Sequence, residues 1–207
     1  GGGGGNWAMG KWCVLKPAEE ACLSALMFAE LARQAGLPSG VLNVVPGLGA
    51  QAGAALAAHD GINHLSFTGS VATGRLVQAA AAQNVVPVTL ELGGKSPQIL
   101  FEDADVAAAL PFLINAGIQN AGQTCSASSR ILAQRSLYDT IVEAMAARYQ
   151  TLVAKPAIED GDLGPLISQR QKAIVENFLS QGHDLTLAAT GQISDTAPAA
   201  GAYVKPH

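Results

Sequence analysis

The residue whose type and surroundings most suggest chemistry is Cys125, within the small, polar stretch NAGQTCSASSR at residues 120–130. This stretch separates a predicted helix from a predicted strand, so we expect a loop that leaves the thiol accessible. A thiol in that position can attack a carbonyl carbon, and nearby backbone N–H groups can stabilise the resulting oxyanion. The alternative is a small buried hydrophobic residue, the usual role of a free cysteine, which suits Cys13 and Cys22.

A second candidate is Glu91, the single acid in the apolar strand pattern VTLELGGKSP at residues 88–97. No histidine lies near Cys125 in the sequence, so Glu91 is the better candidate for a general base that activates water. The alternative is an acid on the solvent-facing side of a strand at the sheet edge.

Two glycine-bearing turns, SFTGSVATG at residues 66–74 and GLGAQAG at residues 47–53, are candidate phosphate sites. A helix N-terminus offers free N–H groups and the positive end of the helix dipole. Gly69 allows close backbone approach, and Ser70 is expected to cap the helix that follows. Neither turn matches the dinucleotide or Walker A pattern, so ordinary capped turns are the alternative.

Lys16 and Glu19, in LKPAEE at residues 15–20, follow directly after a predicted strand. A carboxylate at the carboxyl end of such a strand can bind ribose hydroxyls, and the lysine can support it. The alternative is a solvated helix start, where an acid interacts favourably with the helix dipole.

Strand-like and helix-like patterns alternate along the whole chain. In the first half we expect strands at 13–17, 40–47, 62–69 and 87–94, and helices at 18–36, 49–59 and 70–83. In the second half we expect strands at 97–101, 128–134 and 184–190, and helices at 103–122, 136–153 and 168–182. These repeated units predict an α/β fold with a doubly wound parallel sheet, which binds ligands at the carboxyl ends of its strands.

The same patterns predict three regions along the chain. Residues 1–12 are glycine-rich and are expected to be a linker or placeholder, and residues 13–92 form a first α/β domain that carries the candidate nucleotide turns. Residues 93–207 form a second α/β domain, with Gly93-Gly94 as the hinge.

Composition narrows the class of protein. Hydrophobic residues make up 49% of the chain and charged residues 14%, which is typical of a globular protein and not of disorder. The net charge of −4 argues against a nucleic-acid partner. With no long apolar run, no secretory pattern, no paired cysteines and scattered histidines, we expect a cytoplasmic protein with no membrane span and no metal site.

Several of these stretches together are similar to a known family. LELGGKSPQILFEDAD followed by NAGQTCSASSR resembles the aldehyde dehydrogenase superfamily, and VLKPAEE, GVLNVVPGLGAQAG, HLSFTGSVATG and DLGPLIS follow the order of that family. Glu91 and Cys125 match its glutamate and cysteine signatures, and their separation of 34 positions (125 − 91) fits the usual alignment. The resemblance implies a partial, Rossmann-like NAD-binding domain at residues 13–92, followed by a partial catalytic domain at residues 93–207.

The resemblance also implies roles for the matching residues. Cys125 would form a thiohemiacetal with the aldehyde and then a thioester, its backbone N–H would bind the oxyanion, and Glu91 would activate the hydrolytic water. The expected cofactor is NAD, with NADP as the alternative, because a carboxylate near the ribose repels an added phosphate. The implied cofactor-binding residues are Lys16, Glu19, Gly49, Gly69, Ser70, Gly74 and Gly93.

Parts of the family pattern are absent. The upstream asparagine motif of the oxyanion hole and the downstream segment that holds the nicotinamide ribose have no match, so we expect a fragment with weak or no activity by itself. Its parent is expected to be a homo-oligomer, a dimer or tetramer. Other readings are a non-catalytic truncated subunit, a CoA-acylating relative and a cysteine hydrolase, and retention of Glu91 counts against the CoA-acylating one.

Overall fold

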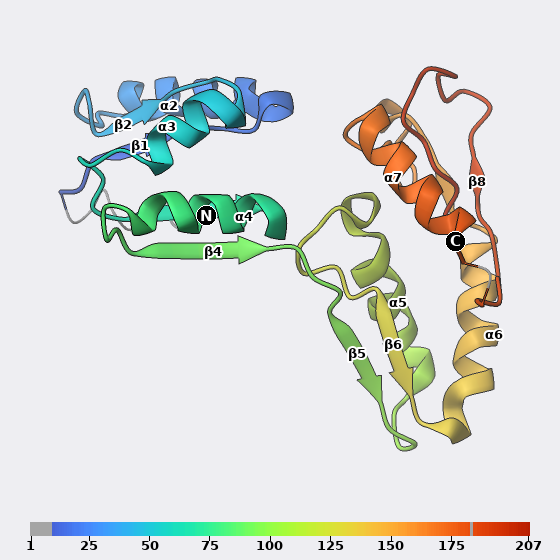
Figure 1. Cartoon of the computed structure of the whole chain (residues 1–207). Helices are drawn as coiled ribbons and strands as arrows, with labels where there is room; N and C mark the ends of the chain where they lie inside the picture. The colour runs from blue at the N-terminus through green and yellow to red at the C-terminus, as the bar shows by residue number, and fades with distance from the viewer. Residues whose placement is uncertain (1–9, 183) are drawn as a thin grey trace. The chain divides into compact units, whose positions relative to one another are not determined.

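The computed structural model of the protein describes residues 10–182 and 184–207. The chain divides into two compact units, and the boundary in the sequence falls between Gly93 and Gly94 (Figure 1). The expected linker at residues 1–12 lies mostly outside the described residues, because residues 1–9 are not described.

The first unit begins with a parallel pair of short strands. Strand β1 (Cys13–Leu15) pairs with β2 (Leu42–Val44), so that Cys13 is opposite Leu42. Helix α2 (Cys22–Gln34) connects them after the single 3₁₀ turn Glu19–Ala21, and it packs against β2. The helix is followed by Gly36, whose φ of +98° is readily adopted only by glycine.

A second parallel pair completes this unit. Strand β3 (Leu65–Gly69) pairs with β4 (Val88–Leu92), and helix α4 (Val71–Ala82) crosses between them and packs on both. Before β3 lie a π-helical turn, Gly49–Gly53, and the short helix α3 (Ala54–Ala57). Three buried residues from these elements form the core, namely Ala57, Leu65 and Ala81.

The second unit repeats the strand–helix–strand arrangement. Strand β5 (Pro97–Leu100) pairs in parallel with β6 (Arg130–Ala133), and helix α5 (Val106–Ile118) lies between them in sequence. Helix α6 (Tyr138–Tyr149) packs against α5. The core is built from one buried residue of each of β5, α5 and α6, namely Leu100, Leu113 and Ile141.

The last part of the chain contains helix α7 (Gln169–Ser180) and a two-residue parallel pair, β7 (Val153–Ala154) and β8 (Gln192–Ile193). The predicted strand at 184–190 is wrong, because pairing with β7 starts only at Gln192, whose N–H donates to Leu152. Residues 184–190 have strand-forming side chains but no strand to pair with, because β7 is only two residues long and pairs with β8.

The predicted α/β class and the parallel pairing are confirmed in the described residues, where each hydrogen-bonded ladder is two-stranded. Several predicted helices are shorter than expected: 49–59 is α-helical only at Ala54–Ala57, 103–122 ends at Ile118, and 136–153 ends at Tyr149. The stretch Gly49–Gly53 is π-helical instead, and after Ile118 the backbone leaves the helix at Gln119, whose ψ is 127°.

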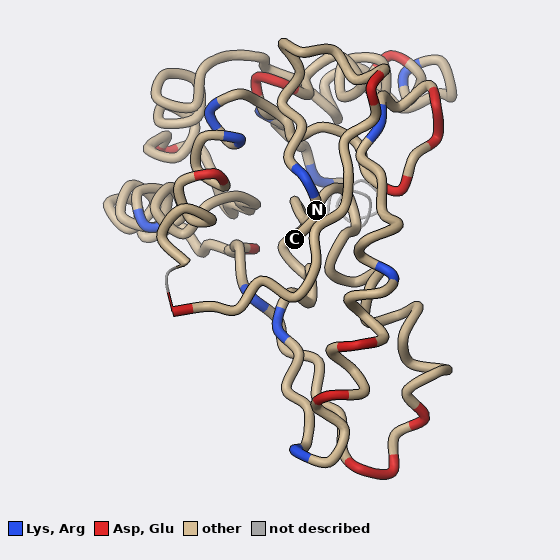
Figure 2. The backbone as a smooth tube through the Cα atoms, turned by 90° about the vertical axis from the view of Figure 1, so that its right-hand side faces the viewer, with Lys and Arg blue, Asp and Glu red and all other residues tan. Residues whose placement is uncertain are grey.

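Figure 2 shows both basic and acidic residues at many places along the backbone. Within the described part of the chain, no helix combines the length and apolar character that crossing a membrane requires.

Candidate active site

Cys125 lies at a corner of a tight turn in the second unit. The backbone N–H of Ala127 donates to the carbonyl of Thr124 over 3.0 Å, so Cys125 and Ser126 occupy the two corner positions. Cys125 is exposed, whereas Ala127 retains only 5% of its accessible surface. The loop therefore presents its thiol to solvent on a turn whose last residue, Ala127, is buried in the unit.

The chain leaving this turn is held by side chains from neighbouring elements. Gln98 of β5 donates through Nε2 to the carbonyls of Leu113 and Ser128, over 3.1 Å and 3.0 Å. Arg130, at the start of β6, donates through Nε to the carbonyl of Lys95 over 2.8 Å. These bonds fix the backbone on the C-terminal side of Cys125 to β5 and α5.

Glu91 lies on β4 in the first unit, opposite Thr68 of β3 in the parallel register. Both residues are exposed, and the apolar residues of β4 alternate with them. The carboxylate is thus spared the desolvation penalty of an acid buried in an apolar strand. Glu91 is therefore exposed to solvent, which agrees with the alternative that it is a solvent-facing acid of the strand. It belongs to a different unit from Cys125.

The carboxylate of Glu19 connects two other predicted site residues. Its Oε1 accepts a hydrogen bond from the backbone N–H of Gly49 over 2.6 Å and lies 3.5 Å from Nζ of Lys16. Backbone N–H groups, of Glu19 itself and then of Gly49, together with the Lys16 ammonium, hold the pKa of this carboxyl below its usual value. The side chain of Glu19 is 41% exposed, so the charged group can still be reached by a ligand.

The parallel pairing of β1 and β2 explains why residues 30 positions apart meet here. Glu19 follows the end of β1 and Gly49 follows the end of β2, and the carboxyl ends of paired parallel strands lie at the same edge. This edge is where an open α/β sheet binds ligands. Lys16, Glu19 and Gly49 are therefore brought together as the sequence predicts.

Ser70 caps helix α4 at the carboxyl end of β3. Its Oγ accepts from the N–H of Thr73 over 3.2 Å and donates to Oγ1 of Thr73 over 3.0 Å. Gly74 is buried one turn further on, where an added Cβ would lie 2.7 Å from Cδ2 of Leu92. The structure thus gives Gly74 a packing role between α4 and β4.

The other two predicted glycines differ in their surroundings. An added Cβ at Gly69 would come within 2.5 Å of the Phe67 ring, so a side chain there would displace that ring. An added Cβ at Gly93 would meet no atom within 4 Å. Gly69 therefore leaves room for the Phe67 ring at the end of β3, whereas Gly93 lies in open space at the end of the first unit.

Sequence reasoning missed Gly53 and Gln123. An added Cβ at Gly53 would lie 3.7 Å from Cδ of Lys16, which places it in the cluster with Glu19 and Gly49. The spacing of four positions between Gly49 and Gly53 in GLGAQAG was the available signal. Gln123 bonds the loop before Cys125 to a distant backbone amide, that of Ile167. The only sequence signal for Gln123 was that a residue with a side-chain amide stands among small residues, two positions before Cys125.

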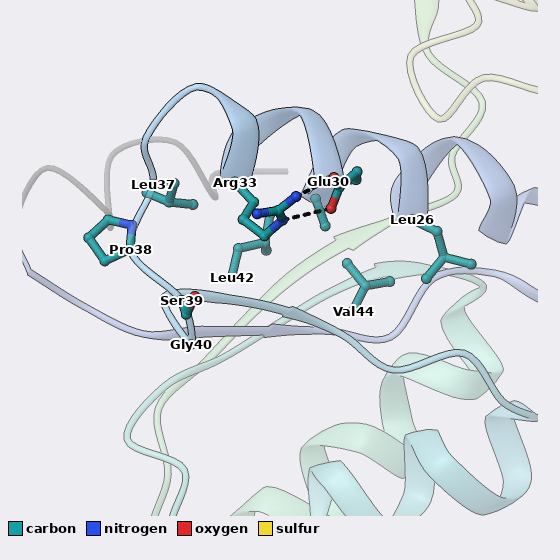
Figure 3. Close-up of a pocket in the computed structure, with 10 residues that line it drawn as sticks. Leu26, Glu30, Arg33, Leu37, Pro38, Ser39, Gly40, Leu42 and Val44 are labelled. Atoms are coloured by element: carbon teal, nitrogen blue, oxygen red, sulfur yellow. Dashed lines mark hydrogen bonds and ion pairs between the residues drawn. The ribbon is translucent and has the colours of Figure 1, made fainter.

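A cavity of about 320 Å³ lies between α2 and β2, and none of the predicted site residues lines it (Figure 3). On its helical wall Arg33 donates to both carboxylate oxygens of Glu30, over 2.6 Å and 2.9 Å. Apolar side chains such as Leu26 and Val44 line the rest. Among the described residues, no group of three or more His, Cys, Asp or Glu could hold a metal ion.

The sequence matches the model of the aldehyde dehydrogenase family over residues 6–207. The chain belongs to the aldehyde dehydrogenase family. Hydroxyisobutyraldehyde dehydrogenase from Mycolicibacterium austroafricanum is 40% identical over 201 residues, which cover 96% of this chain and 40% of that protein. An aldehyde dehydrogenase from Emericella nidulans is 46% identical over 178 residues, covering 84% of this chain and 36% of that protein. The chain thus spans two fifths or less of the length of these relatives.

Solved structures of aldehyde dehydrogenases share the fold. One from Burkholderia cenocepacia, described provisionally as an aldehyde dehydrogenase, is 57% identical with a TM-score of 0.94, covering 96% of this chain and 42% of that one. The NAD⁺ complex of the Bacillus cereus enzyme is 40% identical with a TM-score of 0.89, covering 96% and 40%. A cysteine-to-alanine variant of aldehyde dehydrogenase C from Pseudomonas syringae, complexed with NAD⁺ and octanal, is 40% identical with a TM-score of 0.87, covering 94% and 41%. These similarities confirm the Rossmann-like α/β fold.

Proposed function

We propose that this chain supplies the nucleophile and the cofactor turns of an enzyme that oxidises an aldehyde to a carboxylic acid with NAD. The observation that carries the proposal is the exposed thiol of Cys125 on a turn fixed to β5 and α5. Membership of the aldehyde dehydrogenase family supports it. The octanal complex of a cysteine-to-alanine variant of a relative also supports it, because that protein binds both an aldehyde and NAD⁺.

In this proposal the Cys125 thiolate attacks the aldehyde carbon and forms a C–S bond, which gives a thiohemiacetal oxyanion. Backbone N–H groups of the turn, including that of Cys125, stabilise that oxyanion. NAD, when bound, accepts the hydride from the same carbon. The carbon–oxygen double bond re-forms and leaves an acyl thioester on Cys125, so the aldehyde loses two electrons and stays attached until water releases it.

We assign release of the acyl group to Glu91. Its carboxylate is exposed on β4 and so has direct access to water. The carboxylate would take a proton from a water molecule as its oxygen attacks the thioester carbonyl. The C–S bond then breaks, and the products are the free thiol and the carboxylic acid. General-base assistance of this kind typically contributes about 10²–10⁴-fold.

The residues of the first unit fit a dinucleotide. The Glu19 carboxylate, steadied by Lys16 and the Gly49 N–H, is suited to ribose hydroxyls. The N-terminus of α4, preceded by Gly69 and capped by Ser70, is suited to a pyrophosphate. Glu19 favours NAD over NADP, because its charge would repel a phosphate on the ribose. A cytoplasmic location and a homo-oligomeric parent stay predictions.

The test is covalent trapping with 4-nitrophenyl acetate, an activated ester that needs no hydride acceptor. The Cys125 thiolate would displace 4-nitrophenolate and carry the acetyl group, which peptide mass spectrometry locates. Cys13 and Cys22 are internal controls in the same chain. We expect acetylation at Cys125 and slow release, with release about 10²-fold slower in Glu91→Gln. The matched control Glu20→Gln, an exposed acid of the same unit, should release at the normal rate.

Acetylation spread equally over the three cysteines would overturn the nucleophile assignment. Release at the normal rate from Glu91→Gln would overturn the general-base assignment. Release that requires added CoA would instead support the CoA-acylating class. In a parallel assay, the formation of NADH from an aldehyde measures the complete oxidation reaction.

A further inference from the structure

We infer that Gln123 is the positioning residue of the nucleophile loop, defined as residues 120–129. The inference rests on the proposed role of Cys125. Gln123 is half-buried, and its side-chain amide makes a bond at each end. Its Oε1 accepts from the backbone N–H of Ile167 over 2.9 Å, and its Nε2 donates to the carbonyl of Asn120 over 3.0 Å.

The N-terminal side of the loop has an unusual backbone that needs such support. After α5, three successive residues have positive φ: Asn120 at 51°, Ala121 at 55° and Gly122 at 76°. A left-handed conformation costs a non-glycine residue roughly 1–2 kcal/mol, so it persists only where other contacts impose it. The backbone N–H and the side-chain Nε2 of Gln123 both donate to Asn120, and they close this turn.

The bond to Ile167 connects the loop to a segment that is itself fixed. The N–H of Leu166 donates to the carbonyl of Ala202 over 2.9 Å. The next residue but one, Ser168, caps α7 by accepting from the N–H of Gln171 over 3.1 Å. Gln123 therefore ties the loop to a well-anchored backbone amide 44 positions away in sequence.

Cys125 depends on this tie because of where it lies in the loop. On its C-terminal side the backbone is held by Gln98 through the Ser128 carbonyl. On its N-terminal side the long-range bond is that of Gln123, whereas the bond from Thr124 Oγ1 to the Gln119 carbonyl, over 3.2 Å, spans only five positions in sequence. Without Gln123 the thiol and its neighbouring N–H groups would no longer be held in fixed positions relative to one another. Misplacement of a reacting group by about 1 Å can lower the reaction rate by about 10²-fold.

Two reactions of the same thiol separate positioning from simple accessibility. Acylation by 4-nitrophenyl acetate passes through an oxyanion and needs the backbone N–H groups in place, whereas alkylation by iodoacetamide does not. In Gln123→Ala we expect acylation of Cys125 to fall by about 10–10²-fold while alkylation changes by less than about threefold. Gln123→Glu keeps an acceptor for the Ile167 N–H and should recover part of the acylation rate.

The matched control is Gln134→Ala. Gln134 also makes two side-chain bonds, accepting from the N–H of Glu102 over 2.9 Å and donating to its carboxylate over 3.1 Å, but it lies after β6. We expect Gln134→Ala to acylate Cys125 at the normal rate. Equal acylation rates in Gln123→Ala and Gln134→Ala would overturn the inference, as would a parallel fall of acylation and alkylation.

Amide hydrogen exchange gives a readout that does not depend on the proposed function. The N–H of Ile167 should lose protection at least about tenfold in Gln123→Ala and in neither Gln123→Glu nor Gln134→Ala. Unchanged protection of Ile167 would overturn the inference. If the unaltered chain does not acylate at Cys125 but Ile167 behaves as expected, the proposed nucleophile is wrong and the anchoring role of Gln123 stands.

Discussion

The carboxylate of Glu19 accepts the backbone N–H of Gly49 over 2.6 Å, joining the turn after β1 to the turn after β2. This bond and the nearby Lys16 ammonium hold a charged group at the carboxyl edge of the first strand pair. The geometry leads to a prediction about cofactor choice, because the same carboxylate would face the ribose of a bound dinucleotide.

Replacing Glu19 by Gln should increase the affinity for NADP relative to NAD by about three- to tenfold. Gln keeps an oxygen that can accept the Gly49 N–H but removes the charge that repels a ribose phosphate. The Kd values of both nucleotides, measured by calorimetry, give the ratio. Glu20→Gln is the control, and an unchanged ratio in Glu19→Gln would remove Glu19 from the ribose site.

Two serine caps provide a matched pair that separates binding from stability. Ser70 caps α4 and Ser168 caps α7 with similar bonds, over 3.2 Å and 3.1 Å. Each Ser→Ala change should lower the free energy of unfolding of its unit by about 1 kcal/mol. Only Ser70→Ala should also weaken NAD binding. Equal NAD affinity in the two variants would contradict a pyrophosphate site at α4.

Val85 carries a strained backbone that substitution should relieve. Its φ is +55° in the turn after α4, and its side chain is 88% exposed. Val85→Gly should therefore raise the free energy of unfolding by about 1 kcal/mol, seen as a higher urea midpoint. Leu76→Gly, at an exposed position within α4, should lower it by about 1 kcal/mol. A lower midpoint for Val85→Gly would contradict the left-handed conformation.

The Glu30–Arg33 pair on α2 predicts a response to acid. Hydrogen bonds from Arg33 and then Gln34 lower the pKa of the Glu30 carboxyl to about 2, from an ordinary value of 4.5. Because the folded pKa is the lower one, the stabilisation is complete above pH 4.5 and is lost as the pH falls towards 2. Carboxyl carbon NMR should show this titration. Arg33→Met should move it towards the ordinary value, and an unshifted titration would refute the pairing.

Much of the site followed from the sequence because it depends on local rules. The turns after β1, β2 and β3 could be predicted from strand ends and glycines, and parallel pairing alone brings Glu19 to Gly49. Ser70 was predictable as a cap, since a serine directly precedes a helical pattern.

What the sequence did not reveal depends on distant or conformational detail. The bond from Ile167 to Gln123 spans 44 positions and exists only once the second unit has folded. The positive φ of Ala121 and Val85 contradicts local preference and occurs where the chain has just left helices α5 and α4. The strand predicted at 184–190 failed because strand propensity has no effect without a free partner.

The central claim is that Cys125 is a nucleophile in a site that responds to NAD, and differential thiol alkylation tests it most directly. The chain would be treated with limiting iodoacetamide, with and without NAD, and each cysteine quantified by mass spectrometry. The account predicts that Cys125 reacts before Cys13 and Cys22, and that NAD changes its rate alone. Equal alkylation of all three cysteines, unaffected by NAD, would contradict it.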